Sequence, residues 1–155
     1  MAFDIFTGSN IKVELATAAP TREESTDFVV VPEIASYPAA AGGESTVIDV
    51  VTFGSVYNRK LIGTRSITDV EINVNWLPDD VTHMQLAKAA EDQTRVQIRF
   101  SYYENASQTT GVCVVLNGFV SNDSVTSDKD AVTVRNFVLS VDGAPISTYN
   151  LPKVP

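Results

Sequence analysis

The chain of 155 residues is poor in the side chains that bind metals, with one cysteine and one histidine. A single cysteine, Cys113, excludes an internal disulfide, and its place in the apolar run from Val112 to Leu116 predicts a small buried side chain instead of a reactive thiol. One cysteine and one histidine do not supply the ligands of a zinc site. The acids Asp123, Asp128 and Asp130 lack the spacing and central glycine of a calcium loop, so a solvated turn is the better interpretation. We expect no cofactor.

The signatures of catalysis are also missing. A nucleophilic triad needs a histidine base beside a serine or cysteine, but His83 falls within a predicted helix and no Gly-x-Ser-x-Gly elbow is present. We expect His83 at a surface or half-buried helix position. The glycine-rich sequences that bind phosphates, of both the Walker and the dinucleotide type, do not occur. The sequence therefore predicts that the protein is not an enzyme.

Basic residues are scarce, since 11 lysines and arginines oppose 19 acids for a formal net charge of -8. This balance argues against a sequence-independent grip on nucleic acid, which depends on neutralising phosphates. Only the stretch from Val47 to Ser66 is net positive, with Arg59, Lys60 and Arg65 against Asp49. In a repeated subunit this stretch would meet an acidic surface of another copy. On charge alone, a solvated loop with three chance bases is the alternative.

Long hydrophobic runs are absent, because no apolar stretch approaches the roughly 20 residues of a membrane helix. The first residues lack the basic head and apolar middle of a secretory signal, so we expect no membrane insertion and no export. The length fits a single domain over residues 1–155. We expect a flexible N-terminal arm (about 1–24) and an extended C-terminal tail (about 146–155) in a proline-rich segment.

Alternating apolar and polar residues predict a mainly β protein. Residues 67–76 alternate between Val70, Ile72, Val74 and polar neighbours, which predicts a half-buried strand, and residues 95–103 follow the same pattern with a basic polar face. Residues 27–35 form a short β-branched run interrupted by Pro32 and predict an edge strand or the end of a strand.

Two more strands are predicted over residues 111–121 and 131–142, joined by a turn over residues 122–130. The apolar parity of the second strand changes between Val134 and Phe137, which indicates a bulge or burial on both faces.

One helix is predicted over about residues 80–92. Pro78, Asp79 and Asp80 supply the early proline and negative charge that a helix N-terminus prefers. The apolar stripe of this helix contains Val81, Met84, Leu86, Ala87 and Ala90. Residues 36–66, in contrast, show no sustained period, and we expect a long loop, which in a compact domain is more often functional than idle.

The order of these segments resembles the major tail tube proteins of bacteriophages with long, non-contractile tails, the lambda-like (siphovirus) group. The resemblance covers roughly residues 25 to 147 and depends on order and spacing. Two positions depart from the family pattern. Gly54 stands where relatives often carry an acidic residue, and residues 64–68 replace a glycine-rich segment that precedes the next strand in relatives. The stretches that carry it are 49–55, 59–63, 69–72, 76–80, 96–100, 116–121 and 138–145.

The resemblance implies a β-sandwich or β-barrel with one flanking helix. It also implies that subunits close into hexameric rings, and that stacked rings form the tail tube of a virion assembled in the host cytoplasm. Double-stranded DNA would pass through without specific binding, and the partners would be further copies of the chain, the tape measure, the tail terminator and the distal tail protein. The long loop would reach the next ring through Tyr57, Arg59, Lys60, Leu61 and Arg65.

A conduit for DNA should have an acidic inner wall, because lysine or arginine side chains on the wall would bind the phosphates and stop the DNA from sliding. Asp69 and Glu71 are our candidates for lining it. The alternative for Glu71 is an ordinary pair with Arg95 or Arg99 across neighbouring strands.

Two further functions stay open. A tail terminator or other ring-forming joint protein would stop at one ring. A β-sandwich ligand-binding module would use Trp76, Tyr102 and Tyr103 as an aromatic platform, although strand parity places Trp76 and Tyr102 on buried faces.

Overall fold

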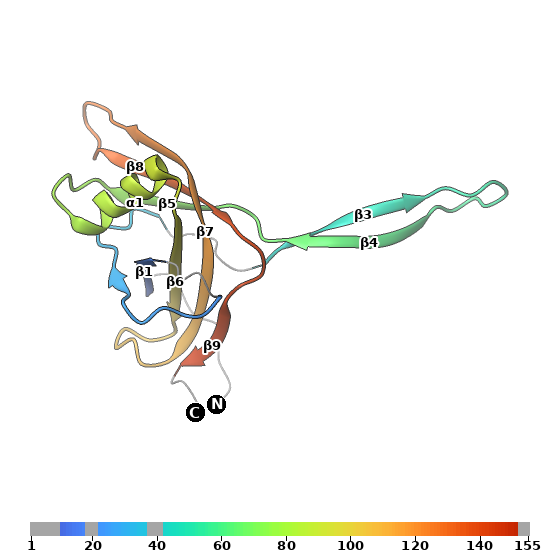
Figure 1. Ribbon diagram of the computed structural model, residues 1–155, viewed down its shortest axis with the longest axis horizontal. Helices are drawn as coiled ribbons and strands as arrows, with labels where there is room; N and C mark the ends of the chain where they lie inside the picture. Colours follow the sequence, from blue (N-terminus) through green and yellow to red (C-terminus); the bar gives the residue numbers. More distant parts are fainter. Residues whose placement is uncertain (1–9, 18–21, 37–41, 152–155) are drawn as a thin grey trace.

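The computed structural model describes residues 10–17, 22–36 and 42–151, and within these ranges the chain forms nine strands and one helix (Figure 1). The prediction of a mainly β fold with one helix is confirmed. The elements are β1 (Ile11–Thr17), β2 (Val29–Val30), β3 (Glu44–Val50), β4 (Arg59–Ser66), β5 (Val70–Asn75), α1 (Val81–Asp92), β6 (Arg95–Tyr103), β7 (Gly111–Thr126), β8 (Val134–Val141) and β9 (Ser147–Leu151).

Seven strands form one antiparallel sheet in the order β2-β1-β6-β7-β8-β5, with β9 also paired to β7. The 16 residues of β7 make this arrangement possible. One edge of β7 pairs with β6, whereas the other pairs with β9 over 111–115 and with β8 over 118–126. Strands β3 and β4 pair only with each other and form a separate hairpin.

The segment from Val29 to Ala35 joins the two outer strands of the large sheet. Its first half is β2, which pairs with β1. Its second half makes two backbone hydrogen bonds of 2.7 Å with Asn73 and Asn75 of β5. The sheet therefore closes into a barrel, which removes open edges. Pro32 has no N–H to donate and lies between the two paired halves. The segment is thus not a free edge, because its halves pair with different strands.

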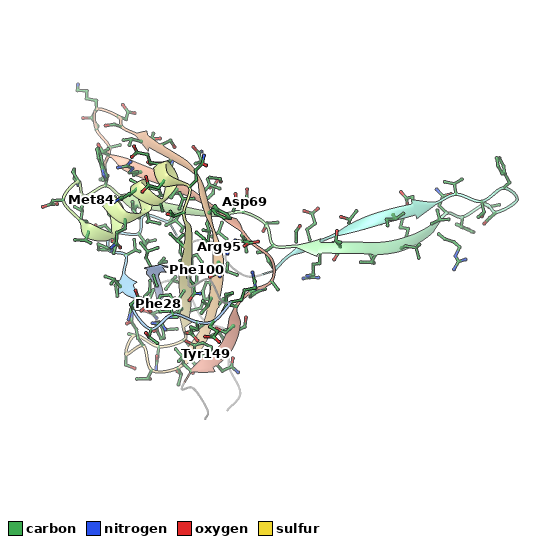
Figure 2. All side chains as sticks on the ribbon, in the orientation of Figure 1. Phe28, Asp69, Met84, Arg95, Phe100 and Tyr149 are labelled. Carbon is green, nitrogen blue, oxygen red and sulfur yellow. The ribbon has the colours of Figure 1, made fainter. Side chains whose placement is uncertain are left out.

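The interior of the barrel contains the apolar positions that alternation predicted for β5, since Val70, Ile72 and Val74 are at most 1% exposed. Phe100 of β6 lies inside the body in Figure 2 and is fully buried. The rest of the core comes mainly from Leu86, Ile98, Leu116, Phe137 and Leu139.

Strand β6 carries the predicted basic residues on its polar side, but this side is only partly exposed: Arg95 is exposed, Arg99 is half-buried, and Gln97 and Ser101 are buried. Gln97 is fully buried; its amide nitrogen donates to Asn117 Oδ1 at 2.8 Å and to the carbonyl of Glu23 at 3.0 Å, while its oxygen accepts from the N–H of Ser25 at 2.7 Å. The chain around residues 23–25 therefore lies over this side of β6. Every polar atom of the glutamine side chain has a partner, as burial demands.

The arginine of this face is neutralised by acids from other segments. Arg99 lies 2.6 Å from a carboxylate oxygen of Glu14 and 3.5 Å from one of Glu24, with its guanidinium over the ring of Phe28. Burial lowers the pKa of Arg99, but the hydrogen bond and charge of Glu14 outweigh it and raise this pKa above its ordinary value. Tyr149 of β9 donates to Glu24 at 3.0 Å. The cluster links β1, β6 and β9.

Both ends of the chain contribute strands where we expected arms. Residues 11–17 of the expected N-terminal arm form β1, which lies between β2 and β6 with Val13 and Leu15 buried. Residues 147–151 of the expected tail form β9. Residues 1–9, 18–21 and 152–155 lie outside the described part of the chain. The partner of β1, β6, is about 80–90 residues away along the chain, and the partner of β9, β7, is about 35 residues away, so neither strand had a local signal.

Helix α1 begins after Asp80, whose carboxylate accepts from the N–H of Thr82 at 3.2 Å, and it ends at Gln93 in the left-handed conformation. The predicted apolar stripe is only partly correct. Leu86 is fully buried, but Val81 and Met84 are 64% and 56% exposed, respectively. The buried face instead contains Thr82, His83, Leu86 and Ala89.

His83 is fully buried, so the expectation of a surface or half-buried position is wrong. The N–H of Leu77 points at its Nδ1 at 3.3 Å. Because Nδ1 must then accept, the ring proton belongs on Nε2, which donates to the carbonyl of Pro32 at 3.0 Å. His83 thereby connects α1 to the segment that closes the barrel.

The predicted turn over 122–130 is wrong in its first half, because β7 continues to Thr126. Of the two alternatives predicted for Val134 to Phe137 of β8, partial burial on both faces is correct, since no residue of β8 is exposed, whereas the bulge lies in β7, where the register shifts between Val120 and Asn122. Within β8, Arg135 occupies an inward position that an apolar residue would otherwise fill; it is paired with Asp123 at 2.6 Å and lies over the ring of Trp76. Its hydrogen bond with Asp123 raises the pKa of Arg135.

We predict that His83→Leu lowers the free energy of unfolding by about 1–3 kcal/mol for each backbone group that loses its partner, the N–H of Leu77 and the carbonyl of Pro32. Chemical denaturation followed by circular dichroism measures this change. Gln85→Leu, on the exposed side of the same helix, is the control and should change stability little. Equal stability of His83→Leu and the wild type would contradict the role of His83 in closing the barrel.

We predict a pH-dependent effect for Tyr149→Phe. Burial, together with the hydrogen bond to Glu24, raises the pKa of Tyr149 to about 12. Because folding raises the pKa of this tyrosine, its protonated form stabilises the folded protein. This contribution is fully present below the ordinary tyrosine pKa of about 10 and is lost as pH rises toward 12. The variant should therefore be about 0.5–1.5 kcal/mol less stable near neutral pH, and the difference should shrink above pH 10. Urea titrations across this range test it, with Tyr57→Phe, whose ring is exposed, as the unaffected control.

Candidate assembly surfaces

The hairpin β3–β4 projects from the barrel as an arm (Figure 1). We define the arm as residues 44–66. The eight residues of β4 span roughly 25 Å at about 3.4 Å per residue, and all eight are exposed. The predicted long loop over 36–66 is therefore wrong for residues 44–50 and 59–66, which are strands; residues 51–58 form the turn between them, and residues 37–41 lie outside the described ranges. A ribbon exposed on both faces has no alternation of burial, and for this reason the sequence showed no period. The β-branched run from Thr46 to Val51 was the available signal.

The tip of the arm, residues 51–58, is held in a turn by Gly54 at φ +89°, a conformation that favours glycine. Ser55 Oγ donates to the carbonyl of Tyr57 at 2.9 Å. Phe53 is fully exposed and Tyr57 is 84% exposed. The turn therefore presents its aromatic side chains to the outside.

The arm carries an unusual amount of exposed apolar surface for a chain in isolation. Large apolar patches on a soluble protein mark interaction sites. The exposed large apolar side chains of the arm are Val47, Ile48, Val51, Phe53, Val56, Tyr57, Leu61 and Ile62.

The predicted contact residues all lie on this arm. Arg59, Lys60, Leu61 and Arg65 are on β4, and Tyr57 is in the tip. Lys60 approaches Asp49 of β3 at 3.9 Å, but both side chains are largely exposed, so the pair contributes little. Within the described residues, Arg59 and Arg65 have no ion pair.

The predicted acids lie on a different surface. Figure 2 shows Asp69 just before β5, on the side of the body where the arm begins. Glu71 is on the exposed side of β5, whose sheet neighbour is β8. The alternative that pairs Glu71 with Arg95 or Arg99 is wrong, because β5 is not adjacent to β6 and these arginines pair with Asp142 and Glu14.

Glu71 belongs to a polar face on the outside of β5, β8 and β7. Its side chains surround a hollow of about 160 Å³ and include three amides and a hydroxyl, with no lysine or arginine. The sequence alone did not assemble this face, because strand order brings together residues more than 60 positions apart. It consists of Glu71, Asn73, Asn122, Ser124, Asn136 and Val138.

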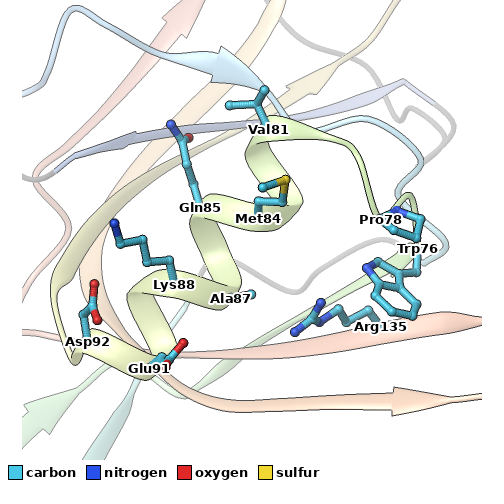
Figure 3. A pocket seen from close by; sticks show the side chains of 10 residues that line it. All are labelled: Trp76, Pro78, Val81, Met84, Gln85, Ala87, Lys88, Glu91, Asp92 and Arg135. Atoms are coloured by element: carbon cyan, nitrogen blue, oxygen red, sulfur yellow. The ribbon is translucent and has the colours of Figure 1, made fainter.

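A second hollow lies between α1 and the end of β5, and we call it the α1 groove (Figure 3). Its volume is about 630 Å³. Trp76 and Arg135 face the helix from the sheet, and Val81 and Met84 line it because they are not part of the core. The full lining is Trp76, Pro78, Val81, Met84, Gln85, Ala87, Lys88, Glu91, Asp92 and Arg135.

The aromatic platform considered for a ligand-binding module does not form. Trp76 directly follows the last residue of β5, which pairs with Val134 of β8, and Val134 in turn pairs with Thr126 at one end of β7. Tyr102 pairs with Val112, near the other end of β7. These two ends of β7 are 14 residues apart, up to roughly 45 Å along the strand. Tyr103 is buried.

Other chemistry finds no support in the described part of the chain. No three histidine, cysteine, aspartate or glutamate side chains there lie close enough to hold a metal ion. Cys113 is buried, as predicted. None of the described helices has the length and apolar character needed to span a bilayer.

Comparison with known sequences finds no family model and no curated protein that matches the chain. Comparison with solved structures does find relatives in fold. The chain is similar to the SPP1 tail tube solved by solid-state NMR and cryo-EM (TM-score 0.58, 9% identity, 97% of this chain and 81% of the other). It is also similar to a chain of the sixfold-symmetrised anti-feeding prophage baseplate (0.66, 9%, 97% and 97%) and of the cap that terminates the anti-feeding prophage tube (0.66, 15%, 97% and 93%).

These similarities extend over nearly the whole chain at low identity, so they concern the fold. The protein has a mainly β, tail-tube-like fold with antiparallel sheets and one helix.

We predict that the backbone amides of the arm exchange with solvent much faster than those of β6 and β7 in dilute protein. The arm pairs only with itself and has both faces in water, whereas β6 and β7 are in the barrel core. Hydrogen exchange read by mass spectrometry provides the comparison within one sample. Equal protection of β4 and β6 would mean that the arm is already packed against something.

Proposed function

We propose that this chain is a structural, non-enzymatic subunit of a phage tail or tail-like particle, and that it assembles into hexameric rings stacked into a tube. The observation that carries the proposal is the arm, a protruding hairpin with eight exposed large apolar side chains on a barrel that is otherwise closed. The likeness to tail tube and tube-cap chains supports it. The siphovirus tail is the setting that we favour within this class.

The energetics of the arm favour assembly. Burying one fully exposed large apolar side chain stabilises by about 1.5–3 kcal/mol, so the eight, several of which are only about half exposed, contribute on the order of 10 kcal/mol. That is comparable with the cost of association, which is about 4–15 kcal/mol. In a tube every arm contacts the same surface of a neighbouring subunit, so the free energy gained by burying the arm is repeated at each ring. We assign Tyr57, Arg59, Lys60, Leu61 and Arg65 to the contact between rings.

The polar face around Glu71 suits the lumen. A wall of amides, hydroxyls and carboxylates without lysine or arginine offers phosphates no cationic sticking point, so DNA slides past it without specific binding. Asp69 lies next to this face at the start of β5 and adds a second carboxylate. The further partners under this proposal are the tape measure, tail terminator and distal tail proteins, within the assembled tail.

A tube cap or terminator is the second candidate. The similarity to the anti-feeding prophage cap, at a TM-score of 0.66, favours it as much as the tube itself. The two functions differ in outcome: a cap stops at one ring, whereas a tube subunit adds rings indefinitely. Electron microscopy of the purified wild type separates them, since isolated rings indicate a cap and long tubes indicate a tube subunit. A protein that forms neither rings nor tubes at any concentration would contradict both.

We predict that replacing Arg59, Lys60 and Arg65 together by Glu leaves the barrel folded but abolishes tubes, because three exposed charges at the contact change sign. Negative-stain microscopy and sedimentation report assembly, and circular dichroism reports folding. Arg59→Glu alone should weaken assembly, and Lys129→Glu, an exposed charge reversal in the turn between β7 and β8, should not. Tubes of normal length from the triple variant would remove these side chains from the interface.

A further inference from the structure

The tip of the arm and the α1 groove lie at opposite ends of the molecule's longest axis (Figure 1). Figure 2 likewise shows Met84 of the groove on the side of the body away from the arm. We propose that the tip of one copy, led by Phe53 and Tyr57, inserts into the α1 groove of a second copy in the neighbouring ring. This inference rests on the proposed function and adds the receptor for the arm.

The chemistry of the groove suits an apolar insert. The ring of Trp76 and the side chains of Pro78, Val81, Met84 and Ala87 make its apolar lining. A volume of about 630 Å³ is within the range of about 300–1,000 Å³ typical of sites that enclose a drug-sized ligand. Such a site accommodates an aromatic side chain together with its neighbours.

The tip supplies the matching shape. Gly54 holds a narrow turn from which Phe53, Val56 and Tyr57 extend, all of them almost fully exposed. No side chain of the barrel covers them. Aromatic residues that enter a desolvated pocket are the usual anchors of a protein interface. Tip and groove are thus two apolar surfaces, each uncovered in the single chain.

Charges around the two surfaces are complementary. Arg59 and Lys60 follow the tip by one or two positions, whereas Glu91 and Asp92 stand on the rim of the groove. The groove also contains two cations. Arg135 is already neutralised by Asp123 at 2.6 Å, and Lys88 is outnumbered by the two rim acids. The rim is therefore net negative and attracts the base of the tip.

The geometry explains why the contact joins rings. Since the arm points away from its own groove, a copy cannot satisfy itself. A contact between different surfaces at opposite ends is heterologous, and repeated along one axis it does not close. Each added ring offers a fresh set of tips on one side and of grooves on the other. This is the property that a tube of indefinite length requires.

The experiment uses two full-length variants, Phe53→Glu in the tip and Met84→Glu in the groove. Both side chains are exposed in the single chain, so both variants should fold. We expect each to need at least about tenfold more protein to form tubes than the wild type, because a hot-spot contact is lost. Val132→Glu, an equally exposed apolar residue outside the groove (63% against 56% for Met84), is the control and should assemble normally.

Mixing the variants gives the sharper test. Phe53→Glu retains an intact groove and Met84→Glu an intact tip, so rings of the two kinds should stack in pairs but not grow further. Trp76 is the one tryptophan of the chain and lines the groove, so its emission should shift to the blue in wild-type tubes and in the mixed pairs, but not in either variant alone.

Each outcome decides the matter. The docking would be overturned if Met84→Glu formed tubes at the same concentration as the wild type, or if the mixed rings did not pair. Either result would leave the tube function intact. Equal loss of assembly in Val132→Glu would also overturn it, since the effect would not be specific to the groove. A wild type that forms neither rings nor tubes would contradict the proposed function itself.

Discussion

The closure of the antiparallel sheet by residues 29–35 is the constraint on which the rest of the structure depends. An open sheet would leave the backbone groups of β1 and β5 without partners, at a cost in stability and with a tendency to pair with other chains. The closing segment contains Pro32, whose carbonyl lies between the two paired halves and takes its hydrogen bond from outside the sheet. His83 supplies it by binding the carbonyl of Pro32, and α1 is thereby fixed over the barrel.

A closed barrel changes what is left for assembly. With its main edges paired, the body gains little from adding strands of other copies at β1 or β5, and the uncovered apolar surface is concentrated on the arm and in the α1 groove. These surfaces differ in kind: a narrow aromatic tip at one end and a hollow at the other. The third surface is the polar face around Glu71, which has no aromatic side chain and no lysine or arginine. The arm, the α1 groove and the polar face therefore differ in shape and charge, although all three lie on one small domain.

Sequence patterns were reliable where burial is one-sided and the signal is local. The alternation of Val70, Ile72 and Val74 and the acidic start of α1 each depend on neighbours within a few residues, and both were confirmed. Patterns failed where coverage came from far along the chain. Residues 23–25 cover Gln97 on the polar side of β6, and Arg135 occupies an apolar position because Asp123 pairs with it. The arm was missed because solvent on both faces leaves no period to detect.

The amino-acid sequence by itself determined the mainly β character, the helix and its start, the burial of Cys113 and the basic segment, since each follows from composition or short-range spacing. Only the tertiary structure decided that this segment is a projecting hairpin, that β1 and β9 join the barrel, and that Trp76, Met84 and Asp92 surround one hollow. The physical reason is that strand pairing joins residues with no fixed separation in sequence, so which backbones meet is settled by the free energy of the whole closed sheet.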